Sequence, residues 1–206
     1  EVDAVNAYSY DPVRKLATLL KKVADLPGGG GHSTRTLLFM PSPQEDTLLI
    51  SVGSSCNVCN EGDERRATIL AYSLVGEKTQ TFATGLRNSV FMAIHPVTGD
   101  IWATENGRDG LGDDVPPDEL NIVESGKDYG WPYCYGQNIH DDDFDSKAVR
   151  SCAGAVPATV DLQAHSAALG LAFIPEEGWP EEWWYDAIVA FHGSWNRSIP
   201  TGYKLV

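Results

Sequence analysis

Residues 87–107 read RNSVFMAIHPVTGDIWATENG, and this stretch decides the fold. Two short apolar runs within it, FMAI at 91–94 and DIWAT at 100–104, have the β-branched and aromatic content of strands. A proline and a turn separate the two runs, and a glycine-containing loop follows the second. The stretch therefore predicts an antiparallel pair of strands, with the polar residues Arg87 and Asn88 leading into the first.

The same design occurs twice more in the chain. One copy, HSTRTLLFMPSPQEDTLLISVGS, begins at His32, and another, SAALGLAFIPEEGWPEEWWYDAIVAFHG, begins at Ser166. When the three copies are aligned on Pro41, Pro96 and Pro175, the residues nine positions earlier are His32, Arg87 and Ser166. Repeats of paired antiparallel strands, spaced by several tens of residues, are typical of β-propeller blades.

The repeat predicts an all-β fold and a β-propeller. At about 40 to 50 residues per blade, residues 1–206 supply about three to four blades, which is an incomplete portion of a ring. We therefore expect one partial propeller domain that belongs to a longer chain. Residues 12–24, PVRKLATLLKKVA, are the only helix-like stretch, and they also suit an outer hairpin. Because inner strands begin beside the central channel, the lead-in residues of successive blades are expected to share one pocket.

The charge balance restricts the class of partner. Fifteen basic residues against 29 acidic ones give a formal net charge of −14. This balance argues against a nucleic-acid partner, since such binding depends on clustered Lys and Arg. It is compatible with cation binding, although a solvated acidic surface explains most of the charge equally well. No apolar run reaches the roughly 20 residues that span a bilayer, so no membrane span is predicted.

Four cysteines fall as two local pairs, Cys56 with Cys59 and Cys134 with Cys152. Two short-range disulfides in an exported protein are the favoured reading. A C-x-x-C motif can also be half of a zinc site, which needs two further ligands at matching spacing. Zinc and free thiols therefore remain the alternatives.

Two motifs precede predicted inner strands and carry chemistry of their own. In GGGGHSTR, residues 28–35, the glycines allow close approach of a ligand, and His32 as a neutral imidazole can take a proton. A flexible turn is the alternative reading of this motif. Arg87 offers a planar fork to carboxylates or ring carbonyls, and Asn88 can both donate and accept. The alternative is a structural arginine paired with an acid.

Three further segments are polar. The acid- and glycine-rich loop ENGRDGLGDDVPPDELN, residues 105–121, favours a hard cation held by carboxylates and backbone carbonyls, although a solvated loop is a serious alternative. Its spacing does not match an EF-hand. The run DDDFD at 141–145 has no glycine scaffold and is expected to be solvated surface. The segment AFHGSWNRSIPTGYK, residues 190–204, places His192, Trp195, Asn196 and Arg197 at the end of a predicted strand.

Taken together, these motifs resemble the soluble quinoprotein sugar dehydrogenases, in particular their L-sorbosone dehydrogenase-like branch. The resemblance covers nearly the whole chain and rests on GLRN, ATENG, DELN and YGWP in that order, with GGGGHSTRTLLF before them and AFHGSWNRSIPTGYK after. It implies a six-bladed propeller that carries pyrroloquinoline quinone (PQQ) over its central channel, with calcium beside the quinone.

The resemblance also implies roles for single residues. His32 matches the catalytic base of that family, and Arg87 and Asn88 match residues that contact the quinone. Gly107 and Arg108 match the pair whose backbone carbonyls hold calcium. Asp118 and Glu119 match the acidic pair near the metal sites. Arg197 matches a basic position near the cofactor.

The function expected from the resemblance is PQQ- and calcium-dependent oxidation of a sugar or sugar aldehyde. The proton would go to His32, the hydride to the quinone, and the electrons to an external acceptor such as a cytochrome or a quinone. We expect an extracellular or periplasmic protein. The alternatives are a propeller that acts as a non-catalytic binding module and a calcium-stabilised structural fragment; the second has no use for His32.

Overall fold

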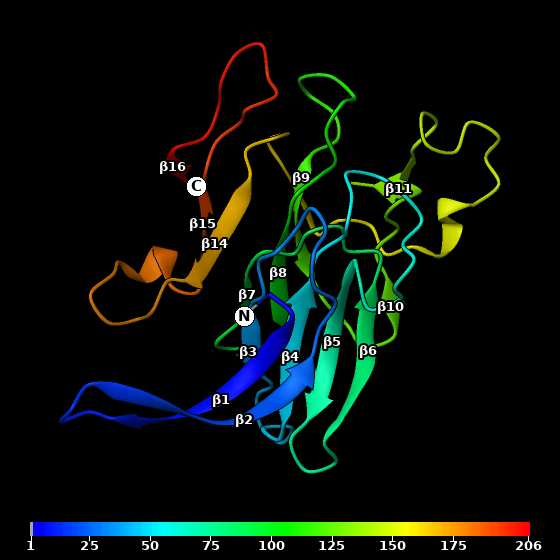
Figure 1. The fold of residues 1–206 in the computed structure, drawn as a ribbon. Coiled ribbons are helices and arrows are strands. Elements are labelled where there is room, and N and C mark those ends of the chain that lie inside the picture. Colours follow the sequence, from blue (N-terminus) through cyan, green and yellow to red (C-terminus); the bar gives the residue numbers. More distant parts are fainter. Residues whose placement is uncertain (1) are drawn as a thin grey trace.

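The computed structural model describes residues 2–206, and β-strands dominate them (Figure 1). Two short 3₁₀ segments, η1 (Cys152–Gly154) and η2 (Glu181–Trp183), are the only helical elements in this part of the chain. Every strand run taken from the repeat is present, so the all-β prediction is confirmed. None of the helical segments between residues 2 and 206 has the length and apolar character to cross a membrane.

The three main sheets each contain antiparallel strands that follow chain order from one side of the sheet to the other. The first four-stranded unit consists of β3 (Leu37–Phe39), β4 (Thr47–Val52), β5 (Thr68–Ser73) and β6 (Lys78–Thr84). The second consists of β7 (Met92–Ile94), β8 (Ile101–Glu105), β9 (Asp118–Ile122) and β13 (Val160–Leu162). A third, three-stranded sheet holds β14 (Ala168–Phe173), β15 (Ala187–Phe191) and β16 (Lys204–Leu205). This is the pattern of propeller blades.

Smaller elements complete the topology. A parallel strand, β10 (Lys127–Asp128), extends the first unit at β6. A small pair consists of β11 (Cys134–Tyr135) and β12 (Ile139–His140). The chain begins with a hairpin of β1 (Ala4–Asp11) and β2 (Leu16–Asp25), so the helix-like residues 12–24 form its turn and most of its second strand. The carboxylate of Asp11 accepts hydrogen bonds from the backbone N–H groups of Val13 and Arg14, which fixes the turn.

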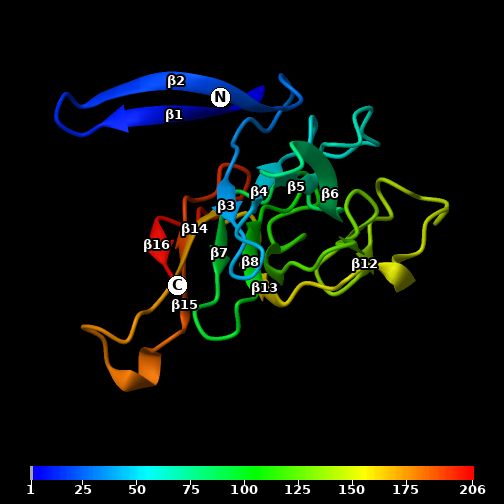
Figure 2. The ribbon, with the colours of Figure 1, turned by 90° about the horizontal axis from the view of Figure 1, so that it is seen from below.

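The cores lie between neighbouring sheets. One cluster joins the first unit to the second through Leu49, Ile69 and Met92, and another joins the second unit to the third through Leu120 and Val189. The base of the hairpin packs on β4 and β5, whereas its outer half projects beyond the body of the protein in both views (Figures 1 and 2). The inner strands are neighbours, because β7 lies beside both β3 and β14. The lead-in residues of the three sheets are thereby brought to one place.

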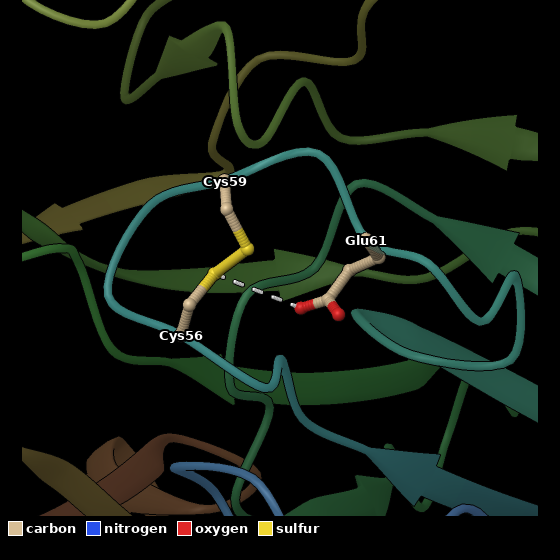
Figure 3. Close-up of side chains that lie close together, drawn as sticks. All are labelled: Cys56, Cys59 and Glu61. Atoms are coloured by element: carbon tan, nitrogen blue, oxygen red, sulfur yellow. Dashed lines mark hydrogen bonds between the residues drawn. A yellow bond between two sulfur atoms is a disulfide. The ribbon is translucent and has the colours of Figure 1, made fainter.

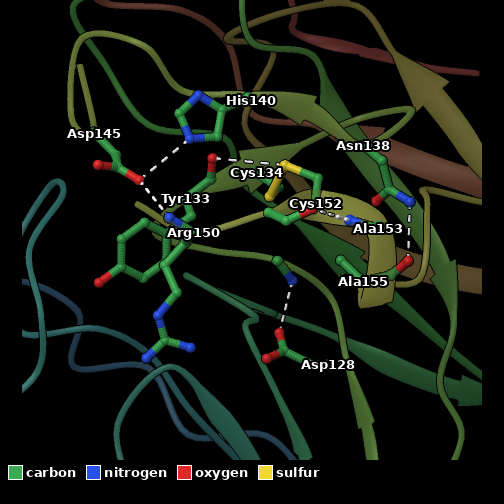
Figure 4. Close-up of a disulfide and its surroundings, with 12 residues drawn as sticks. Asp128, Tyr133, Cys134, Asn138, His140, Asp145, Arg150, Cys152, Ala153 and Ala155 are labelled. Atoms are coloured by element: carbon green, nitrogen blue, oxygen red, sulfur yellow. Dashed lines mark hydrogen bonds and ion pairs between the residues drawn. A yellow bond between two sulfur atoms is a disulfide. The ribbon is translucent and has the colours of Figure 1, made fainter. Parts of the chain in front are cut away.

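Both expected disulfides are present, Cys56–Cys59 and Cys134–Cys152 (Figures 3 and 4). The sulfurs of Cys56 and Cys59 lie near the Glu61 carboxylate, but as a disulfide they offer no thiolate to a metal. This excludes the zinc alternative for this pair.

The prediction of a wholly solvated DDDFD run is wrong. Asp141 and Asp145 are buried, because Asp141 pairs with Arg108 at 2.6 Å and Asp145 contacts His140 at 3.3 Å. The remaining acids of the run, Asp142 and Asp143, are exposed as expected. The chain returns to the body of the protein at these two positions, and sequence composition alone does not reveal such anchors.

Candidate active site

A cavity of about 240 Å³ lies where the first, second and third sheets meet. The residues that line it come from the lead-in segments of the three sheets, from the acid-rich loop and from the segment after β15. They are His32, Arg87, Asn88, Asn106, Gly107, Asp109, Asp118, His165, Ala167, Gly193, Trp195 and Asn196. Of the residues singled out from the sequence, the structure thus brings together His32, Arg87, Asn88, Gly107, Asp118, Trp195 and Asn196.

His32 is half-buried at this cavity, and its tautomer follows from one contact. Nδ1 lies 3.1 Å from the carbonyl oxygen of Ser54 and 2.9 Å from the Ser54 hydroxyl. Since a carbonyl oxygen only accepts, Nδ1 carries the hydrogen and Nε2 keeps the lone pair. Burial lowers the pKa of His32 from 6.5 to about 4, and the positive charges of Arg87, Arg35 and Arg66 act in the same direction. At neutral pH the ring is therefore a neutral base.

The glycine segment before His32 is held by a buried arginine. The Arg66 guanidinium donates to the backbone carbonyls of Pro27, Gly28 and Gly29 at 2.6–3.1 Å. Gly30 has a φ of +84°, and a Cβ there would lie 2.9 Å from the Cα of Ser55. The run of glycines is thus anchored to the body of the protein by Arg66, although the glycines themselves are exposed.

Gly53 sets the distance between two residues of the site. A Cβ at this position would lie 2.6 Å from the Cβ of His32 and 2.8 Å from Oδ1 of Asn88. No real Cβ tolerates such contacts, so only glycine lets the two side chains approach this closely. Gly53 follows directly after β4, at the end that faces the cavity.

Arg87 is 6% exposed, and part of its donor capacity is already used. Nε donates to the Asn57 carbonyl at 2.8 Å, and the two terminal nitrogens donate to Asn57 Oδ1 at 2.9 Å and to the Asn106 carbonyl at 3.1 Å. The guanidinium has five N–H groups, so two of them are left for a ligand. Its nearest carboxylate is that of Asp109, at 3.8 Å.

Asn88 is oriented by a buried carboxylate. Glu105 accepts from the Asn88 backbone N–H and from the Ser89 hydroxyl, both at 2.7 Å. Desolvation raises the pKa of Glu105 to about 8, and the nearby Glu119 charge adds to the effect. The Asn88 side-chain amide lines the cavity and finds no hydrogen-bond partner among residues 2–206. It is therefore available to a ligand.

Gly107 and Asp118 meet at the wall of the cavity. Asp118 is 1% exposed, and its Oδ1 accepts from the Gly107 N–H at 3.0 Å. Its Oδ2 has no partner in good hydrogen-bond geometry among the described residues. Burial raises the pKa of this carboxyl group, while the nearby backbone N–H groups of Gly107, Ala168 and Ala167 oppose the shift. An unpaired carboxylate oxygen on a buried side chain is costly without a cation or a proton.

The other two expected metal residues face a smaller cavity next to the first. It measures about 20 Å³, and Glu105, Gly107, Arg108 and Glu119 are among its lining residues. Gly107 belongs to both cavities. Desolvation raises the pKa of Glu119 to about 7, while hydrogen bonds from Asn121 and the Gly136 N–H oppose the shift. The cavity has room for one small ion or water beside two buried carboxyl groups, and Arg87 and Arg108 also line it.

Arg197 lies apart from the cavity lining. Its guanidinium donates to the backbone carbonyls of Asp113 and Ala164 and pairs with Asp114 at 3.1 Å. The preceding residue, Asn196, lines the cavity instead and donates to Asp109 at 2.7 Å. Arg197 stays outside the cavity lining because its guanidinium anchors the segment to the acid-rich loop. This anchoring turns Asn196 toward the cavity.

Sequence reasoning missed His165 and Asn57. Nε2 of His165 lies 2.8 Å from the carbonyl oxygen of Gly112, so that nitrogen donates, and Nδ1 accepts from Asn196 at 3.3 Å. His165 directly precedes Ser166, the third lead-in residue, and this adjacency was the available signal. Asn57 lies in the Cys56–Cys59 loop, outside the repeat, and nothing in the pattern marked it.

Comparison with known proteins adds to this geometry. An uncharacterized protein of Borreliella burgdorferi is 38% identical over 163 residues, which are 79% of this chain and 42% of that protein. A pyrroloquinoline quinone-dependent sugar dehydrogenase of Hypocrea jecorina is 31% identical over 163 residues, covering 65% of this chain and 38% of that enzyme. The chain thus spans less than half the length of these two relatives.

A calcium structure of the family AA12 carbohydrate-active enzyme of Trichoderma reesei superposes with a TM-score of 0.84 and 26% identity. The superposition covers 100% of this chain and 60% of that enzyme. The sheets of this chain accordingly form part of a β-propeller. The family model described as TrAA12-like matches residues 1–206. From its first residue to its last, the chain belongs to the TrAA12-like family.

Proposed function

We propose that the full-length protein containing this chain is a PQQ- and calcium-dependent dehydrogenase that oxidises a sugar or sugar aldehyde of the aldose or sorbosone type. The observation that carries the proposal is the pairing of a neutral His32 with a buried Arg87 in one cavity. A pure scaffold needs neither group there. The chain covers only part of the relatives it matches, so the proposal concerns the full-length protein.

The residues of the cavity suit PQQ. The two free N–H groups of Arg87 and the free amide of Asn88 match the carboxylates and ring carbonyls of such a ligand. Asn196 and His165, from the segments next to the third sheet, line the same cavity. When bound, PQQ supplies the acceptor for a hydride, a chemistry that side chains lack.

Calcium suits the loop that joins β8 to β9. The backbone carbonyls of Gly107 and Arg108 would hold the ion beside the quinone, and Asp118 and Glu119 contribute buried carboxyl groups nearby. The unpaired Oδ2 of Asp118 supports this assignment. The ion would supply positive charge that polarises carbonyl groups. Arg108 is itself fixed by the buried carboxylate of Asp141, which steadies its backbone.

The chain's own contribution to the chemistry is base catalysis and orientation. Nε2 of His32 takes the hydroxyl proton of the substrate, because Nδ1 is committed to Ser54 and the ring is neutral. The hydride of the substrate carbon would need the acceptor that bound PQQ supplies, so the sugar would give up two electrons while one proton remains on His32. An external cytochrome or quinone then takes the electrons. Two disulfides fit an oxidising compartment, extracellular or periplasmic.

The test is dye reduction by the full-length protein with added PQQ and calcium, across a panel of aldoses and sugar aldehydes. We expect activity in the wild type and a loss of at least about 100-fold in His32→Ala, the usual contribution of a general base. Absence of PQQ binding would overturn the proposal and leave a non-catalytic propeller. Equal activity in His32→Ala would overturn only the role of His32.

A further inference from the structure

The segment Ser54–Glu61, here called the disulfide loop, links the parts of the candidate site that come from different sheets. It follows β4 and is closed by the Cys56–Cys59 disulfide (Figure 3). The Glu61 carboxylate accepts from the Ser55 N–H at 2.6 Å and from the Ser55 hydroxyl at 2.7 Å. The loop is thus closed twice, once by a covalent bond and once by a carboxylate bridge.

The first contact of the loop is with Arg87. Asn57 accepts from Arg87 with two atoms, the backbone carbonyl from Nε at 2.8 Å and Oδ1 from a terminal nitrogen at 2.9 Å. This two-point grip fixes the plane of the guanidinium. Because both contacts come from one residue, the orientation of Arg87 depends on where the disulfide loop holds Asn57.

The second contact is with the loop expected to hold calcium. Asn57 Oδ1 accepts from the Asp109 N–H at 2.8 Å, and Nδ2 donates to the Asp109 carbonyl at 3.0 Å. One side-chain amide thus pairs with both backbone groups of a single residue, as a strand neighbour would. Asp109 directly follows Gly107 and Arg108, so this pairing fixes the chain beside their carbonyls.

The third contact is with His32. Ser54 lies at the start of the loop, and its carbonyl and hydroxyl oxygens accept from Nδ1 of His32. The Ser54 hydroxyl itself donates to the Cys56 carbonyl at 2.6 Å. The Gly31 N–H donates to the Ser55 carbonyl at 2.8 Å. One short loop therefore touches the candidate base, the candidate quinone contact and the candidate calcium loop.

We propose that Asn57 is a positioning residue of the active site, and that the Cys56–Cys59 disulfide holds it so that it orients Arg87 and the Asp109 backbone toward the cofactor. This inference rests on the proposed function for its consequence, cofactor binding. Its structural part, the hold on Arg87, is independent of that function. Asn57 is exposed, so replacing it removes its three side-chain hydrogen bonds without opening the core, while its backbone carbonyl still accepts from Arg87.

The experiment compares four variants of the full-length protein with the wild type. Asn57→Ala removes the side-chain contacts, and Asn57→Asp restores the acceptor for Arg87 and for the Asp109 N–H. A Cys56→Ser/Cys59→Ser double variant releases the loop. Asn60→Ala is the matched control, because Asn60 is an exposed asparagine of the same loop whose side chain bonds only to the Tyr133 hydroxyl.

The first readout is phenylglyoxal labelling of arginine, mapped by peptide mass spectrometry without added cofactor. We expect Arg87 to label at least about threefold faster in Asn57→Ala and in the double variant, since a charge-assisted hydrogen bond is lost. Asn57→Asp and Asn60→Ala should label at the wild-type rate, and buried Arg66 should label equally in all. Unchanged Arg87 labelling in both Asn57→Ala and the double variant would overturn the inference, whether or not PQQ binds.

The second readout is PQQ affinity by fluorescence titration in the presence of calcium. We expect about a tenfold weaker affinity in Asn57→Ala, with recovery in Asn57→Asp. Faster Arg87 labelling combined with unchanged PQQ affinity would overturn the positioning role. Failure of the wild type to bind PQQ would instead refute the proposed function, and the labelling result would still decide whether Asn57 holds Arg87.

Discussion

Nδ1 of His32 lies 3.1 Å from the carbonyl oxygen of Ser54, and this one contact decides which ring nitrogen is basic. The carbonyl can only accept, so Nε2 keeps its lone pair. Burial and the neighbouring positive charges keep the ring unprotonated, with a pKa of about 4. The arrangement keeps the His32 ring neutral well below pH 7.

The lowered pKa of His32 has a consequence for stability. The unfolded state, with a pKa near 6.5, takes up a proton more readily than the folded state, so the contribution of His32 is present above pH 6.5 and is lost between pH 6.5 and about pH 4. We predict that His32→Gln loses less stability than the wild type between pH 7 and pH 4.5, measured by denaturant unfolding. Parallel losses in both proteins would contradict the lowered pKa.

Gly53 should be irreplaceable even by alanine. The added methyl group would press on His32 and Asn88 at 2.6 and 2.8 Å, so one or both must move. We predict that Gly53→Ala weakens PQQ binding by about tenfold and destabilises the fold by about 1–3 kcal/mol. Gly62→Ala is the control, because a Cβ there meets no heavy atom within 4 Å. Equal PQQ affinities of the two variants would show that the close approach is irrelevant to the site.

Arg66 should matter for stability far more than its neighbour Arg65. Arg66 is 7% exposed and bonds only to backbone carbonyls, which would lose their donor in Arg66→Ala. Arg65 pairs at the surface with Asp63. We predict a loss of about 3 kcal/mol for Arg66→Ala and less than about 1 kcal/mol for Arg65→Ala, from urea unfolding. Similar small losses would mean that the glycine segment does not need this anchor.

Calcium should stabilise the protein through Glu119. We predict that adding calcium to the chelator-treated, full-length protein raises its thermal midpoint. A cation that binds the folded state shifts the folding equilibrium toward that state. Glu119→Gln should lose most of this increase. Glu124→Gln, at an exposed acid on the same segment, should keep it. An equal calcium effect in all three proteins would place the ion elsewhere.

The sequence was sufficient for the architecture, because each repeat carries its own strand pair and turn. The convergence of His32, Arg87 and Asn88 at one cavity followed from the same repeat, whereas Gly107 and Asp118 were expected there from the family resemblance. The third lead-in residue, Ser166, does not line the cavity as the repeat predicted. It is buried, whereas its neighbours His165 and Ala167 line the cavity.

What the repeat could not predict lies in the irregular loops. Asn57 reaches Arg87 across 30 positions of chain, through a loop whose shape depends on a disulfide. The buried pairing of Asp141 with Arg108 likewise joins segments 33 positions apart. Such contacts depend on how loops close in space, and no local pattern of residues encodes them. The anchoring of Arg197 to the acid-rich loop, with Asn196 turned toward the cavity, is another contact between segments that lie far apart in the sequence.

The most direct test of the account is an equilibrium titration of the calcium-loaded, full-length protein with PQQ, followed by fluorescence. The account predicts saturable binding of one PQQ per chain, and a loss of at least about tenfold in affinity in Arg87→Ala, whose guanidinium would pair with the ligand. Absence of saturable binding by the wild type, or equal affinity in Arg87→Ala, would contradict it.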